Sequence, residues 1–67
     1  MDLNYVRVGF EDHLFAALQS EAERLGLTAD QVVYRATAAW ICEMAENPDV
    51  LAAARDAMAV VRVQADA

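Results

Sequence analysis

The sequence has few of the residues that stabilise a small protein through covalent or metal cross-links. It contains one cysteine, Cys42, and one histidine, His13, in 67 residues. One cysteine cannot form an intramolecular disulfide, and with one histidine it cannot supply a conventional structural zinc site. Because a chain of this length buries too little apolar surface to be comfortably stable alone, we expect it to associate with another chain.

Lysine is absent, and the five basic residues are all arginine. Eleven acidic residues give a net charge of −6. That charge opposes general attraction to nucleic acid, because neutralisation of phosphates supplies most non-specific affinity. The planar guanidinium group of arginine still suits bidentate contacts with guanine, carboxylate or phosphate. Charge alone therefore does not identify the partner.

Signals for export, membrane insertion and catalysis are also lacking. The first residues carry no basic flank or apolar stretch of a signal peptide, and no apolar run approaches the roughly 20 residues of a membrane span. There is no Ser/His/Asp set, no glycine-rich phosphate loop and no evident pair of catalytic carboxylates. We expect a cytoplasmic protein that makes no membrane contact, is not an enzyme and binds no metal or cofactor.

Residues 3–10 alternate as a one-sided strand does. The apolar face carries Val6, Val8 and Phe10, and the opposite face carries Tyr5, Arg7 and Gly9. An amphipathic helix is predicted from about Asp12 to Leu25. Its apolar residues recur at helical spacing, at Leu14, Phe15, Leu18, Ala22 and Leu25. Gly26 follows where a left-handed helix stop is needed.

A second helix is predicted to follow Thr28. The segment Thr28-Ala29-Asp30-Gln31 matches a capping box, in which the threonine hydroxyl accepts from the Gln31 backbone and the glutamine side chain reaches back. The apolar stripe of this helix is Val32, Val33, Ala36, Trp40, Ile41 and Met44. The pair Asn47-Pro48 ends it, because the residue before a proline avoids helical geometry.

Asn47 as cap and Pro48 as first helical residue also predict a third helix. Its weaker stripe is Val50, Leu51, Ala54, Met58 and Val61. Residues 60–64 are β-branched enough to form a strand instead, and we prefer a helix that frays towards Ala67. We therefore divide the chain into a domain of residues 1–47 and a C-terminal helical extension of residues 48–67.

A lone strand at residues 3–10 leaves backbone donors and acceptors unpaired along both edges. Within the chain only residues 60–63 offer a partner, which would give a monomeric α+β domain. A second copy offers an identical strand that pairs antiparallel about a twofold axis, and this homodimer is the simpler solution. We expect its core to contain Val6, Val8, Phe10, Leu14, Leu18, Val33 and Trp40.

The order of these elements resembles the ribbon-helix-helix family of the MetJ/Arc type, which includes repressors and antitoxins. The resemblance covers about residues 3–44. It is carried by the alternation in Tyr5-Val6-Arg7-Val8-Gly9-Phe10, the helix end Glu23-Arg24-Leu25-Gly26-Leu27-Thr28 and the spacing of Val32-Val33, Ala36 and Trp40-Ile41. It implies a mostly α, intertwined homodimer with a two-stranded antiparallel β-ribbon between the subunits, followed here by the C-terminal helix.

In this family the ribbon lies in the major groove, and its outward side chains read base edges. The resemblance therefore implies a transcriptional regulator whose Tyr5, Arg7 and Gly9 contact operator DNA. It also implies that Thr28 and Ala29, at the start of the second helix, hold a phosphate, since helix N-termini attract anions.

A second reading stays open, because Arg7 is the only cation of the ribbon and Asp30 repels a phosphate docked at the second helix. In that reading the chain is an acidic interaction module on the same fold, which no longer binds DNA and docks a protein partner. Residues 49–67 then bind a partner such as a toxin, or merely pack on their own dimer.

Overall fold

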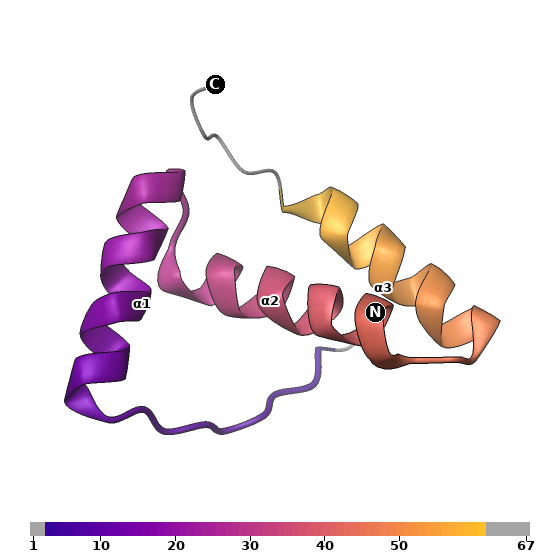
Figure 1. Ribbon diagram of the computed structural model, residues 1–67, viewed down its shortest axis with the longest axis horizontal. Helices are drawn as coiled ribbons and strands as arrows, with labels where there is room; N and C mark the ends of the chain where they lie inside the picture. Colours follow the sequence, from indigo (N-terminus) through magenta and orange to yellow (C-terminus); the bar gives the residue numbers. More distant parts are fainter. Residues whose placement is uncertain (1–2, 62–67) are drawn as a thin grey trace.

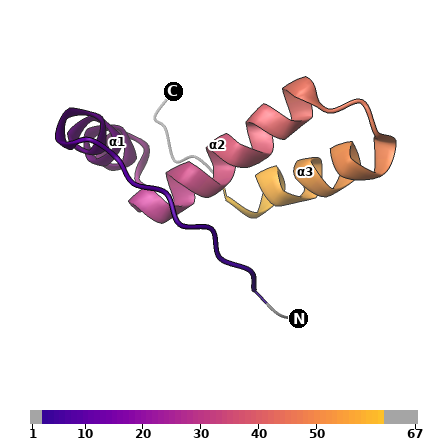
Figure 2. The same ribbon diagram turned by 90° about the horizontal axis from the view of Figure 1, so that it is seen from below.

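The computed structural model describes residues 3–61, and within that range the chain forms three helices and no strand. Helix α1 spans Asp12–Leu25, α2 spans Ala29–Met44 and α3 spans Pro48–Val60. Helix α2 is central: α1 crosses near its start, and α3 folds back beside it (Figure 1). The α2–α3 hairpin is seen most clearly from below (Figure 2).

The junction between α1 and α2 has the geometry that the sequence predicts. Gly26 adopts φ 71° and ψ 29°, the left-handed conformation that glycine tolerates best, and the Leu27 amide donates to the Ala22 carbonyl at 2.9 Å. The capping box is present, since the Gln31 amide donates to Thr28 Oγ1 at 3.2 Å and the Thr28 amide donates to Gln31 Oε1 at 2.9 Å. These contacts fix where α2 begins relative to α1.

Helix α2 ends at Met44, three residues before the predicted stop at Asn47. Ala45 is already extended, with φ −76° and ψ 147°. The early stop frees Asn47 to cap the next helix, where its Oδ1 accepts from the Asp49 amide at 2.8 Å. Pro48 takes the first helical position, as predicted.

Helix α3 is fixed against α2 by side chains of α2. The Arg35 guanidinium donates from Nη1 to the carbonyl oxygens of Met58, at 3.2 Å, and Val61, at 2.9 Å. Cys42 Sγ lies 3.7 Å from Met58 Sδ. Because the last carbonyls of a helix have no partner within it, Arg35 satisfies the end of α3 while joining it to α2. The predicted fraying of this helix towards Ala67 falls on residues 62–67, outside the described part.

Residues 3–10 form an extended segment without a strand partner in the described part of the chain. In the monomeric alternative, residues 60–63 pair with this segment as a strand. Val60 does not, because it is the last residue of α3. Residues 62–64 lie outside the described range. A single chain therefore leaves the backbone of residues 3–10 open to pairing from outside.

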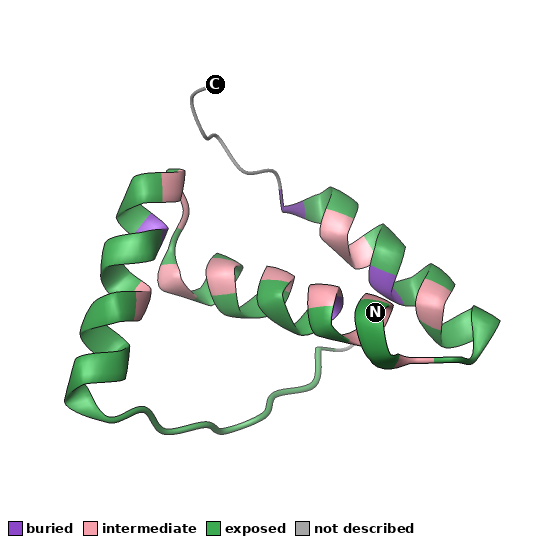
Figure 3. Cartoon of the chain, in the orientation of Figure 1, coloured by how far each residue is buried: buried purple, intermediate pink, exposed green. Residues whose placement is uncertain are grey.

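Burial within the single chain is slight (Figure 3). The buried residues of the described part are Ala22, Ala38, Ala54 and Val61. The chain exposes 5841 Å², whereas a folded monomer of its mass exposes about 4,200 Å². Its radius of gyration is 13.1 Å, against about 11 Å for a compact domain of this length. The three helices thus form an open arrangement with large uncovered apolar faces.

Candidate functional site

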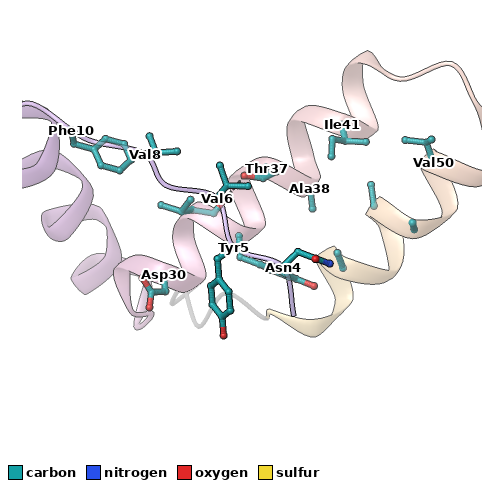
Figure 4. Close-up of a pocket in the computed structure, with 15 residues that line it drawn as sticks. Asn4, Tyr5, Val6, Val8, Phe10, Asp30, Thr37, Ala38, Ile41 and Val50 are labelled. Atoms are coloured by element: carbon teal, nitrogen blue, oxygen red, sulfur yellow. Dashed lines mark hydrogen bonds between the residues drawn. The ribbon is translucent and has the colours of Figure 1, made fainter. Parts of the chain in front are cut away.

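The principal surface feature is an apolar groove between the extended segment and the α2–α3 hairpin, here called the hairpin groove, with a volume of about 750 Å³. Figure 4 shows the extended segment running along the groove, with Phe10 at one end and Asn4 at the other. The groove is lined by Asn4, Tyr5, Val6, Val8, Phe10, Asp30, Val33, Tyr34, Thr37, Ala38, Ile41, Val50, Ala53, Ala54 and Ala57. The start of the extended segment therefore lies nearest α3.

A second groove, here called the α1 groove, lies between α1 and α2, with a volume of about 470 Å³. It is lined by Phe10, Leu14, Leu18, Glu21, Val32, Val33, Ala36, Thr37 and Trp40. Phe10, Val33 and Thr37 line both grooves, so the two apolar surfaces are continuous. This shared surface is open to solvent in the single chain.

Every residue predicted for the dimer core lines one of these two grooves. The large side chains among them are far from buried: Val6 is 86% exposed, Trp40 is 63% exposed and Phe10 is 38% exposed. The structure thus brings the predicted core residues to one continuous surface, on which a single chain leaves them uncovered. Whether a second copy covers that surface stays a prediction.

Of the three residues predicted to face outward from the ribbon, two line neither groove and one lines the hairpin groove. Arg7 and Gly9 are exposed and line neither groove, but Tyr5 is 86% exposed and lines the hairpin groove beside Val6. A Cβ added at Gly9 would meet no atom within 4 Å. Nothing in the described part of the chain therefore requires a glycine at that position.

The start of α2 presents few free donors for an anion. The Gln31 amide donates to the Thr28 hydroxyl, and the Val32 amide donates to the Thr28 carbonyl at 3.1 Å. The amides of Ala29 and Asp30 are the first-turn donors left in the described structure. The exposed carboxylate of Asp30 sits on the same turn, where it stabilises the helix start and opposes a phosphate.

Two of the arginines in residues 3–61 are committed to contacts within the chain. Arg24 pairs with Glu21 one turn earlier, and Arg35 caps α3. The Arg24 hydrogen bond, aided by its charge, lowers the pKa of Glu21, and the same contact raises the pKa of Arg24. Arg7 and Arg55 have no ion-pair or hydrogen-bond partner in the described part of the chain, and only Arg7 lies on the extended segment.

Within residues 3–61 no three His, Cys, Asp or Glu side chains come together as metal ligands. No helix in this range has the length and apolar character needed to cross a membrane. Comparisons with family models, with curated proteins and with solved structures gave no match. The grooves and the extended segment are therefore the features of the described chain that bear on function.

Sequence reasoning missed the contribution of Tyr34 and of α3 to the hairpin groove. Tyr34 precedes Ala38 and Ile41 by four and seven residues, the spacing of a helix face, which was a usable signal. Ala53 and Ala57 follow Val50 at helix-face spacing too, but alanine on a helix face does not by itself indicate a groove. Small alanine side chains line a groove only when another helix holds them beside it, and that depends on tertiary packing.

Proposed function

We propose that this protein is a homodimeric regulator of the ribbon-helix-helix type, which binds operator DNA through a ribbon formed by residues 3–10 of two copies. The observation that carries the proposal is the uncovered apolar surface around the hairpin and α1 grooves, next to an extended segment with unpaired backbone. A second copy provides both missing contacts at once, an antiparallel strand and an apolar face.

The amount of exposed surface supports association between copies. The chain exposes 5841 Å², about 1,600 Å² more than a folded monomer of its mass. An obligate homodimer typically buries roughly 2,000–5,000 Å² in its interface, and an exposed surface of this size leaves ample area for one. Apolar burial of this extent is the main driving force for such association.

The support for DNA binding is narrower, and it comes from the residues of the extended segment that line neither groove. Arg7 is exposed and uncommitted there, and the open space at Gly9 leaves the backbone accessible to a close neighbour. A paired ribbon of this kind fits the major groove, where a bidentate arginine discriminates guanine by about 1–3 kcal/mol. Two copies present two such arginines.

The test is fluorescence anisotropy of a labelled pool of random-sequence duplexes, followed by the fragments that the protein enriches. We expect saturable binding to particular fragments that weakens as salt rises. Arg7→Ala should abolish this binding while the dimer persists. Arg55→Ala is the matched control, because it removes the same charge from an exposed site on α3. Equal binding by the Arg7 variant and the wild type would refute the DNA reading.

The net charge of −6 favours a second candidate function, an acidic module that docks a protein partner on the same dimer. The first-turn carboxylate of Asp30 opposes phosphate at the α2 start, which also favours this candidate. The same titration separates the two functions. A dimer that binds no duplex even at low salt would leave the interaction module as the explanation.

A further inference from the structure

The hairpin groove is formed partly by α3, a helix outside the three elements that give the proposed fold its name. Its α3 wall consists of Val50, Ala53, Ala54 and Ala57, and Ile41 contributes from α2. Arg35 of α2 donates to the carbonyls of Met58 and Val61 and so holds the two helices together, which makes the wall a fixed part of the single chain. The groove therefore exists before any partner arrives.

Strand direction determines what reaches this groove in a dimer. In an antiparallel pair related by a twofold axis, the end of one segment lies beside the start of the other. The start of the segment, at Asn4 and Tyr5, lies in the groove beside α3, and the end, at Phe10, leads directly into α1 (Figure 4). The second copy therefore brings its Phe10, and then the start of its α1, to α3.

We propose that the hairpin groove receives the start of α1 from the second copy, so that α3 is part of the dimer interface. This inference rests on the proposed homodimer. The incoming segment has the required chemistry, because Phe10 is 38%, Leu14 is 47% and Phe15 is 44% exposed in the single chain. Each copy both offers this segment and receives it, so the contact occurs twice in the dimer.

The groove is unsuited to a polyanion. Its lining is mainly apolar, and the carboxylate of Asp30 is among its polar groups. A nucleic acid backbone placed there would leave phosphates facing aliphatic side chains and a like charge. An apolar helix start instead matches the lining in chemistry.

The first test places a charge on each side of α3 in the full-length protein. Ala53→Arg inserts a guanidinium at an exposed position that lines the groove, whereas Ala52→Arg does so at an exposed position that lines neither groove. Sedimentation velocity over a dilution series measures the dimer dissociation constant of each variant. We expect Ala53→Arg to raise that constant by about tenfold or more, because a charge buried against apolar groups is strongly disfavoured, and Ala52→Arg to leave it unchanged.

A second test does not depend on weakening the dimer. We mix two versions of the chain, both with Cys42→Ala. One carries Glu11→Cys and a mass tag, and the other carries Ala53→Cys. The mixture is then treated with a short bismaleimide. Glu11 makes no side-chain cap contact, so its replacement removes no bond from α1. We expect more cross-linked heterodimer from this mixture than from one in which Ala52→Cys replaces Ala53→Cys, because position 52 lines neither groove.

The outcomes separate this inference from the proposed function. A wild-type chain that is monomeric at every concentration would overturn both. A wild-type dimer in which Ala53→Arg behaves as Ala52→Arg, with no more cross-linking of position 11 to position 53 than to position 52, would leave the homodimer in place and overturn the role of α3.

Discussion

Trp40 gives the sharpest test of whether the uncovered face is an interface. In the single chain Trp40 is 63% exposed, so its truncation to alanine would cost the isolated chain little; surface substitutions usually change stability by less than about 0.5 kcal/mol. If a second copy covers the exposed part, about 150 Å² of mainly apolar surface leaves water, which stabilises the dimer by roughly 3–4 kcal/mol per copy at ~25 cal/mol per Å². The two readings therefore differ by several kcal/mol.

The assay is urea denaturation of wild type and Trp40→Ala at several protein concentrations, followed by circular dichroism. We expect the wild-type midpoint to rise with concentration, as it does when folding is linked to dimerisation, and the variant midpoint to fall sharply. Trp40 is the only tryptophan, so its emission also reports the interface directly and should shift to longer wavelength as the wild-type dimer is diluted.

Val60→Ala is the control, because Val60 is 72% exposed and lines neither groove. Its midpoint should match that of the wild type. A wild-type midpoint independent of concentration, together with a Trp40→Ala variant as stable as Val60→Ala, would refute the reasoning that the exposed apolar face is covered by a second copy.

Two further predictions concern the single chain. Arg35→Ala should destabilise the protein by about 1–3 kcal/mol, because the carbonyls of Met58 and Val61 lose their donor. Amide hydrogen exchange should then become faster in α3 than in α1, and equal protection of the two helices would contradict this assignment. Thr28→Ala should lower the free energy of unfolding, measured by thermal denaturation, by about 1 kcal/mol, since the Gln31 amide loses its acceptor. Thr28→Ser should keep most of that stability, and a serine variant as unstable as the alanine variant would contradict the cap.

The boundary between α1 and α2 was predictable because local chemistry fixes it. Gly26 and the Thr28–Gln31 capping box are signals within four residues, and α1 and the start of α2 lie where those signals place them. The end of α2 at Met44 was not predicted. Proline excludes helix at the residue before it, but it does not require the helix to persist that far, and here Asn47 serves α3 instead.

Contacts distant in sequence were beyond prediction. Arg35 is 23 residues from Met58, and a lone arginine on a helix gives no sign that it will cap a neighbour. Cys42 has intermediate exposure, and its contact with Met58 depends on how α3 folds back. The pairing of residues 3–10 was argued from unmet hydrogen bonds, and a single chain leaves those unmet.

The single chain buries small residues and leaves large apolar residues exposed. The buried residues of the described part are three alanines, Ala22, Ala38 and Ala54, and one valine, Val61, while Val6, Leu14 and Trp40 stay exposed. A stable monomer shows the reverse order, because large apolar side chains gain most from leaving water. Small alanine side chains bury little apolar area. The single chain therefore buries mainly small residues, and we infer that the large ones stabilise it when a second copy covers them.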